Sequence, residues 1–311
     1  MPVITTWNLE NFFRPGGEYG PRTQDAYEKK LAYLADRINA LAPGVVAVQE
    51  VGDPRALADL AGRLPGTWRT ALSSHPDRRG IRVGFLSRTP VTTVGEVTAL
   101  PAPLLPVQVG DAPTDTDGSM GRGALHIRTT AGGLELDLVT AHLKSKLLAY
   151  PGGRFNPRNE DERARYGAYA LYRRTMEAAT LRIYANRILQ GGVQNLVVLG
   201  DMNDTELAAT TQILYGPDGS QLGTPGFDRP DAGDASRLWN IAPRIPDGHR
   251  FSRLHGGDRE LIDHILLSHS LVQNLAGADA YTQDITTIGN TPASRRDATV
   301  PDHAPVTVRI G

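Results

Sequence analysis

Short apolar runs alternate along the chain with longer segments whose apolar positions recur at helical spacing. Eight runs rich in Val, Ile and Leu, mostly bounded by Gly, Pro or Asp, predict β-strands. They cover residues 3–7, 44–49, 82–87, 125–129, 134–140, 195–199, 261–268 and 306–310. Residues 23–41, 53–63 and 160–190 predict helices, and the Gly pair within 131–133 predicts a hairpin. This alternation is typical of an α/β protein.

Two long segments rich in Gly, Pro and Asp, residues 102–120 and 216–234, predict solvated surface loops. Neither is expected to separate two domains. The strand-like runs on each side of them need partners from the other half of the chain.

Composition narrows the classes of function. The chain has 33 basic and 34 acidic residues among 311, so no global basic field marks it as a nucleic-acid binder, although a local patch remains possible. The lack of Cys excludes disulfides, thiolate metal sites and a cysteine nucleophile. No apolar run approaches the roughly 20 residues of a membrane span, and the N-terminus lacks the pattern of a signal peptide. We therefore expect a cytoplasmic protein, while an exported protein whose signal was removed fits the same observations.

Polar side chains follow three of the predicted strands at the point where each strand ends. Asn8 and Glu10 follow the first strand, Glu50 follows the second, and Asp201 and Asn203 follow the run 195–199. Side chains at strand ends gather over one rim of an α/β sheet, and residues two apart in an extended chain face the same way. Carboxylate and amide oxygens without Cys suit a hard cation, so the sequence predicts Mg²⁺ or Mn²⁺ rather than zinc.

Two histidines extend this set. His142 ends the strand 134–140, and His303 lies just before the last strand. Asp263 stands within the apolar run 261–268, where an unpaired carboxylate would cost several kcal/mol. A histidine is the natural partner, and we predict a buried hydrogen bond between Asp263 and His303.

The ordered set of these motifs resembles the endonuclease/exonuclease/phosphatase superfamily, whose members include deoxyribonuclease-like metal-dependent phosphodiesterases. The motifs are Trp7-Asn8, Gln49-Glu50, Thr140-Ala141-His142, Gly200-Asp201-Met202-Asn203, Ile262-Asp263-His264-Ile265-Leu266 and Asp302-His303. Together they span residues 7–303. The resemblance implies a four-layer α/β sandwich, in which two packed mixed β-sheets are flanked by helices. It also implies that residues 1–311 form a single catalytic domain.

The resemblance implies a metal site as well. Glu50 would be the principal ligand of Mg²⁺ or Mn²⁺, with Asn8 beside it. Glu10 stands where abasic-site endonucleases carry an acidic ligand. Asp302 would be a further metal or orienting group.

Catalytic roles follow in the same way. Asp201 would orient or activate the attacking water, and Asn203 would hold the phosphate. His142 would donate to the phosphoryl oxygens or assist the leaving group. His303 would act as general base or phosphate contact, steered by Asp263.

Basic residues near these motifs are candidates for substrate binding. Lys144 and Lys146 follow His142, and Arg122 precedes a strand where some nucleases of the family place a phosphate-binding arginine. Arg158 belongs to a basic and aromatic stretch, residues 151–174. Such a stretch can bind a nucleic-acid strand by charge and base stacking. A solvated helix with ion pairs has the same composition, and we favour this second interpretation.

These features predict a divalent-metal-dependent phosphodiester hydrolase, most simply a nuclease that cleaves DNA or RNA by direct attack of water. A phosphodiesterase or phosphatase for a sphingolipid or a small phosphorylated metabolite is the first alternative. A non-catalytic binding module on the same scaffold is the second. The expected partner is nucleic acid or another phosphodiester substrate, with neither a membrane span nor an obligate protein partner.

Overall fold

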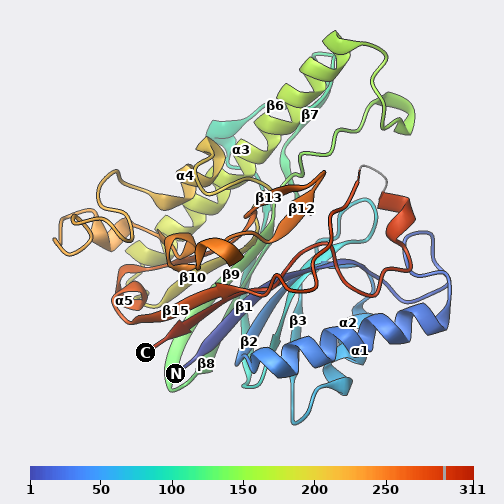
Figure 1. Ribbon diagram of the computed structural model, residues 1–311. Helices are drawn as coiled ribbons and strands as arrows, with labels where there is room; N and C mark the ends of the chain where they lie inside the picture. Colours follow the sequence, from blue (N-terminus) through green and yellow to red (C-terminus); the bar gives the residue numbers. More distant parts are fainter. Residues whose placement is uncertain (290–291) are drawn as a thin grey trace.

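Two mixed sheets packed face to face form the centre of the protein, and helices cover the outer face of each (Figure 1). The computed structural model describes residues 1–289 and 292–311. The first six-stranded sheet has the order β15 (Leu275–Ala280), β16 (Val306–Ile310), β1 (Val3–Phe12), β2 (Val45–Val51), β4 (Arg82–Ser87), β3 (Arg69–Leu72). The second has the order β11 (Trp239–Asn240), β14 (Asp263–Leu267), β10 (Leu196–Asp201), β9 (Leu134–His142), β8 (Ser119–Ala131), β5 (Val91–Ala99).

The remaining elements lie around these sheets. Two small ribbons pair β6 (Val107–Gln108) with β7 (Thr116–Asp117), and β12 (Arg253–His255) with β13 (Asp258–Glu260). The helices are α1 (Gln24–Leu41), α2 (Pro54–Arg63), α3 (Glu160–Gln190), α4 (Ala209–Tyr215) and the short α5 (His269–Val272).

Alternation along the strands produces the four layers. In β2, Val45 and Ala47 belong to the core between the two sheets, whereas Val46 and Val48 pack toward α1 and α2. The central strands are buried on both faces, which explains why they read as nearly continuous apolar runs. A third core lies between the second sheet and α3. The predicted α/β sandwich is therefore confirmed.

Sequence patterns located the central strands but not their full lengths. β1 continues beyond its predicted end to Phe12. The predicted loop 102–120 was wrong in part, because it contains β6 and β7 and because β8 already begins at Ser119. Residues 217–233 form turns and bends, as predicted for the second loop.

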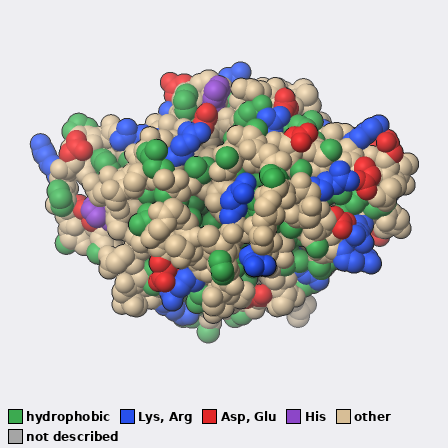
Figure 2. Space-filling view, turned by 90° about the horizontal axis from the view of Figure 1, so that it is seen from below, with side chains coloured by type: hydrophobic (Ala, Val, Ile, Leu, Met, Phe, Trp, Pro, Cys, Tyr) green, Lys and Arg blue, Asp and Glu red, His purple; other side chains and the backbone are tan. Residues whose placement is uncertain are grey.

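The surface has a mixed charge. On the face in Figure 2, Lys and Arg side chains lie among Asp and Glu instead of gathering into one field. Within the described part of the chain, no helix is both long enough and apolar enough to cross a membrane.

Candidate active site

Strand register brings the motif residues to one edge of the two sheets. β9 and β10 run parallel with His142 opposite Asp201, and the antiparallel β14 places Asp263 opposite Asp201 on the other side. In the first sheet, the parallel strands β1 and β2 pair Asn8 with Gln49, next to Glu50. The edge predicted from strand ends is therefore formed by both sheets.

Close packing beneath Asp201 requires a glycine. Gly200 has φ +140°, and a Cβ at this position would lie 2.0 Å from the carbonyl oxygen of Ala141. Only glycine allows β10 to approach β9 so closely at this point. The Gly-Asp pair thus sets the position of Asp201 beside His142.

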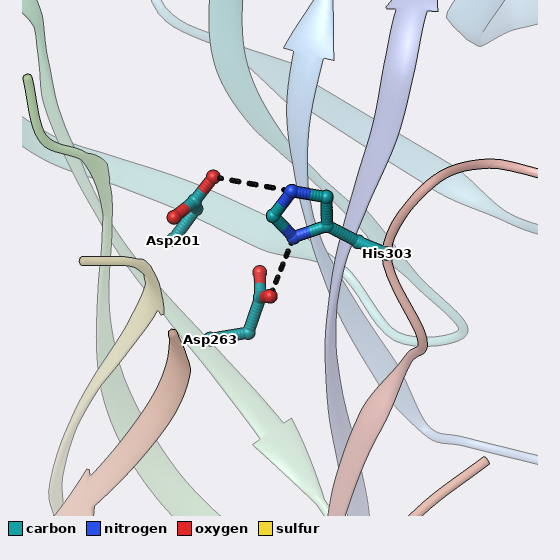
Figure 3. Close-up of side chains that lie close together, drawn as sticks. All are labelled: Asp201, Asp263 and His303. Carbon is teal, nitrogen blue, oxygen red and sulfur yellow. Dashed lines mark hydrogen bonds and ion pairs between the residues drawn. The ribbon is translucent and has the colours of Figure 1, made fainter. Parts of the chain in front are cut away.

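His303 lies between two buried carboxylates (Figure 3). Its Nδ1 is 2.6 Å from Asp263 Oδ2, which confirms the predicted pair, and its Nε2 is 3.9 Å from Asp201 Oδ2. Burial alone would lower the pKa of His303, but the charges of Asp263 and Asp201 outweigh it and raise this pKa to about 10. The imidazole is therefore cationic at neutral pH, which suits contact with a phosphate better than removal of a proton.

Asp201 is held by donors on both of its oxygens. Asn8 Nδ2 donates to Oδ2 at 3.0 Å, and the backbone N–H of Asn203 donates to Oδ1 at 2.9 Å. Burial, followed by the charge of Asp263, raises the pKa of Asp201 to about 7. A fixed carboxyl group with a pKa near neutrality is suited to accepting a proton from water.

His142 has the opposite protonation state from His303. Its Nε2 lies 3.3 Å from Asp201 Oδ2, while burial, assisted by the positive charge of Arg122, holds its pKa well below the usual value. The neutral ring can donate from one nitrogen only. Among the described residues, its buried Nδ1 has no hydrogen-bond partner, so this nitrogen is left for a group outside the protein.

Glu50 remains ionised in a partly buried position. The backbone N–H of Asn11 donates to its Oε2 at 2.7 Å. Burial would raise the pKa of Glu50, but the positive charges of Arg79 and Arg122 outweigh it and lower this pKa. Glu50 and Asn11 both have positive φ, 62° and 47°, a conformation that costs non-glycine residues energy and is concentrated at functional sites.

Glu10 and Asp302 form a separate acidic pair at the edge of the site. Arg295 binds the Glu10 carboxylate through two nitrogens, with Nη2 2.8 Å from Oε2, and the backbone N–H of Asp302 donates to the same oxygen at 3.0 Å. Lys30 Nζ donates to the carbonyl of Glu10 at 2.5 Å. Both Glu10 oxygens therefore already have cationic or N–H partners, unlike those of Glu50.

The predicted substrate-binding residues separate into two groups. Arg122 Nη1 and Asn203 Nδ2 both donate to the carbonyl of Leu143, at 3.3 and 3.0 Å, so Arg122 belongs to the site. Lys144 lies beside Arg122 in the lining of a groove. Arg158 is exposed in the loop before α3, where its backbone N–H donates to Glu162, and it is not part of that lining.

Several residues of the site had no sequence signal. Arg79, Arg295 and Lys30 come from a loop or a helix, where an isolated basic residue is usually solvated. Gln49, in contrast, was named in the Gln49-Glu50 motif but given no role, although an amide inside a buried strand needs partners. Its Nε2 donates to Thr6 Oγ1 in the same sheet at 3.1 Å and to Thr140 Oγ1 in the other sheet at 3.0 Å. The second bond ties the two sheets together under the site.

Comparison with known proteins agrees with this geometry. The model of the endonuclease/exonuclease/phosphatase family matches residues 5–284. The chain belongs to the endonuclease/exonuclease/phosphatase family. Members of this family are metal-dependent phosphoric ester hydrolases, and the protein is therefore an enzyme of this class.

Solved structures show the same fold along the whole chain. A truncated TDP2 from Caenorhabditis elegans superposes with a TM-score of 0.57 at 12% identity, covering 99% of this chain and 96% of that one. The mannosyl-6-phosphatase of Bacteroides thetaiotaomicron has a TM-score of 0.56 at 13% identity, and the 3′ phosphatase NExo from Neisseria, bound to a product DNA hairpin, has 0.53 at 16%. Each of the latter two covers 100% of both chains.

A partial match also exists among curated proteins. The dihydrolipoyllysine-residue acetyltransferase component of the pyruvate dehydrogenase complex from Staphylococcus aureus is 27% identical over 124 residues, or 38% of this chain. The match spans only 28% of that protein, so it shows no shared family.

The donor set of the site fits the divalent cation on which this family depends. One ligand atom from each of Asp201, Asp263 and His303 lies within 4.8 Å of the others, and all three residues are buried. His303 and Asp263 are already hydrogen-bonded to each other, whereas Glu50 Oε2 has only a backbone N–H. Ionised carboxylate oxygens are the ligands that Mg²⁺ and Mn²⁺ prefer.

Proposed function

We propose that this enzyme hydrolyses phosphodiester bonds of nucleic acid by direct attack of water, with Mg²⁺ or Mn²⁺ as cofactor. The observation that supports this proposal most strongly is the buried row Asp263–His303–Asp201, which combines a cationic donor with a carboxylate that titrates near neutrality. The 3′ phosphatase NExo, which has this fold and is bound to a product DNA hairpin, is consistent with a nucleic-acid substrate.

The residues of the row divide the chemistry between them. Asp201, held by Asn8 and Asn203, accepts the proton of the attacking water. The imidazolium of His303 donates to a phosphoryl oxygen as negative charge builds up in the transition state, while Asp263 fixes the orientation and charge of the ring. Asn203 and the neutral His142 complete the contacts to the phosphate or to the leaving oxygen.

The cofactor would be held by Glu50, with Asn8 beside it. When bound, it supplies positive charge to the phosphoryl group and the leaving oxygen. Glu10 and Asp302 remain candidate ligands, although Arg295 already neutralises Glu10.

A substrate panel tests the proposal. Purified enzyme with Mg²⁺ or Mn²⁺ is incubated with plasmid, single-stranded DNA, RNA, sphingomyelin and bis-p-nitrophenyl phosphate. We expect kcat/KM to be highest on a nucleic acid and measurable on the small diester, and Asp201→Asn to abolish both activities. Turnover of sphingomyelin or of the small diester alone would reassign the substrate to a lipid or a small phosphorylated metabolite.

A further inference from the structure

A groove next to the catalytic residues has no assigned role. It has a volume of about 590 Å³, within the range of small-ligand sites, and lies between the loop that contains His75, the beginning of β8, the loop after β9 and the N-terminal half of α3. Arg122 and Lys144 are part of its lining. Because Arg122 and Asn203 donate to the same carbonyl, that of Leu143, one end of the groove meets the proposed phosphate site.

Tyrosine rings form one wall of this groove. Tyr166 and Tyr169 line it, with ring centroids 5.4 Å apart in an edge-to-face arrangement. Tyr150 continues the row on one side at 5.2 Å from Tyr166, and Tyr172 continues it on the other at 6.4 Å from Tyr169. Aromatic residues make up only 6% of the chain, so four consecutive rings beside the active site are a local concentration.

The rings are held in place before any ligand arrives. The hydroxyl of Tyr169 donates to Asp111 Oδ1 at 3.1 Å, and Arg165 pairs with the same carboxylate at 2.8 Å. Tyr166 is buried between its neighbours. A preorganised aromatic surface loses little conformational entropy on binding.

Charged side chains make up much of the rest of the lining. The lining contains four cationic residues and three carboxylates, namely Arg78, Arg122, Lys144 and Arg173 with Asp77, Asp117 and Glu177. Arg122 Nε lies 3.3 Å from Asp77 and Arg173 Nη2 lies 2.9 Å from Asp117, so ion pairs fix both guanidinium groups. The excess of a single positive charge fits one phosphodiester group rather than a long polyanion.

We propose that this groove binds the unpaired nucleotides next to the scissile phosphate, with a phosphate on Arg122 and Lys144 and a base against Tyr169. The proposal rests on the proposed nuclease function and specifies its substrate as single-stranded or frayed nucleic acid. Stacking on a side-chain ring requires a base whose face is free, which a base inside a duplex does not offer. The ion pairs predicted for the start of α3 are present. Tyr166 and Tyr169 follow them in the same helix, but these two side chains line the groove.

The test compares three tyrosine variants. Tyr169→Leu removes a ring of the wall, Tyr169→Phe keeps the ring without its hydroxyl, and Tyr172→Leu removes a ring from the same helix that is outside the lining and half exposed. Fluorescence anisotropy measures Kd for a labelled single-stranded octanucleotide and for a duplex of the same sequence, both in EDTA. Steady-state rates with metal give KM for the octanucleotide and kcat/KM for bis-p-nitrophenyl phosphate.

We expect Tyr169→Leu to weaken binding of the single strand roughly 5- to 100-fold and to raise KM in proportion, as for the loss of one stacked base. Tyr169→Phe and Tyr172→Leu should bind within about twofold of the unaltered protein. The duplex should bind more weakly than the single strand, and hydrolysis of the small diester should be unchanged in all three variants.

Equal Kd values for Tyr169→Leu and Tyr172→Leu, or equal affinity for duplex and single strand, would overturn the groove assignment even if nucleic acid is cleaved. Conversely, the expected difference in binding without cleavage of any nucleic acid would refute the nuclease function and leave the groove assigned. If Tyr169→Leu fails to fold, photocrosslinking of a 5-bromouracil oligonucleotide to the unaltered enzyme tests the groove assignment instead. Crosslinks in peptides containing Tyr166 or Tyr169 support the groove, and crosslinks elsewhere reject it.

Discussion

Asp263 never has to touch the substrate to influence the reaction. Its carboxylate contacts His303 and lies opposite Asp201 in the sheet, and its negative charge raises the pKa of both neighbours. In the proposed mechanism, one buried charge therefore tunes two groups with opposite requirements: Asp201 must be deprotonated to accept a proton, and His303 must be protonated to donate.

This arrangement predicts a bell-shaped pH profile of kcat/KM on a small diester. Activity should rise as Asp201 loses its proton, with a pKa of about 7, and fall as His303 loses its proton, with a pKa of about 10. In Asp263→Asn, loss of the negative charge lowers both pKa values, so both limbs should move to lower pH, the alkaline one by about 1–3 units. Asp279→Asn, which removes a surface partner of His249, is the control. An alkaline limb that stays in place in Asp263→Asn would contradict this role.

Two glutamates at the site have the same chemistry but different partners, which makes them a matched pair. We expect Glu50→Gln to weaken Mn²⁺ binding by about 10-fold or more, because it removes the ionised carboxylate proposed to hold the metal. Glu10→Gln should retain Mn²⁺ binding but lower the melting temperature, since it leaves the Arg295 guanidinium without its partner. Calorimetric titration with Mn²⁺ and thermal melting measure these effects. Equal loss of Mn²⁺ binding in both variants would instead place Glu10 among the ligands.

Glu50, His142 and Asp201, which the sequence identified, share one property: each stands at or directly after the end of an apolar run, where a polar side chain is conspicuous. Those that it missed, such as Arg79 and Arg295, come from loops and contact the site only through tertiary packing. Arg158 illustrates the converse limit. It is close to His142 in sequence, yet the loop between β9 and α3 leaves it exposed and outside the groove.

At the scale of elements, the pairing of β9 with β10 determines the site. The register places His142 opposite Asp201 only because β10 approaches β9 at Gly200 without a side chain. The strand register sets the positions of the motif residues at the sheet edge. Arg79, Arg295 and Lys30, which lie in loops and helices, contact this edge from outside the sheets.

Gly200→Ala should therefore lower both stability and activity. The added Cβ would overlap the Ala141 carbonyl, and φ +140° is unfavourable for alanine, so we expect the free energy of unfolding to fall by about 2 kcal/mol or more. Gly62→Ala, in α2 with no atom within 4 Å of the new Cβ, should instead be neutral or stabilise by up to about 1 kcal/mol. Urea unfolding and hydrolysis of the small diester measure both. A Gly200→Ala protein as stable and active as the unaltered one would show that the close approach is unimportant.

Periodicity predicted the buried central strands well because burial on both faces leaves little choice of residue. It missed short or exposed strands such as β3, β5 and β15, whose polar positions resemble loops. Strand ends were also placed too early, since β1 and β2 continue through their polar residues with irregular register. The polar side chains within these strand ends are the ones proposed to act in catalysis and metal binding.

At the scale of the whole molecule, the active site exists because two sheets are packed face to face. Asn8 and Glu50 belong to the first sheet, while His142, Asp201 and Asp263 belong to the second. The buried hydrogen bond from Gln49 in the first sheet to Thr140 in the second links the sheets beneath the site. Neither sheet alone carries all of the groups proposed for catalysis and metal binding.

Chelation and restoration of the metal test the central claim most directly. Hydrolysis of bis-p-nitrophenyl phosphate is measured for the unaltered enzyme, for the enzyme in excess EDTA, and after EDTA is removed and Mg²⁺ or Mn²⁺ added. We predict that activity disappears with EDTA and returns with either metal, while Asp201→Asn stays inactive throughout. Full turnover in EDTA, with no metal bound to the protein by elemental analysis, would contradict the account.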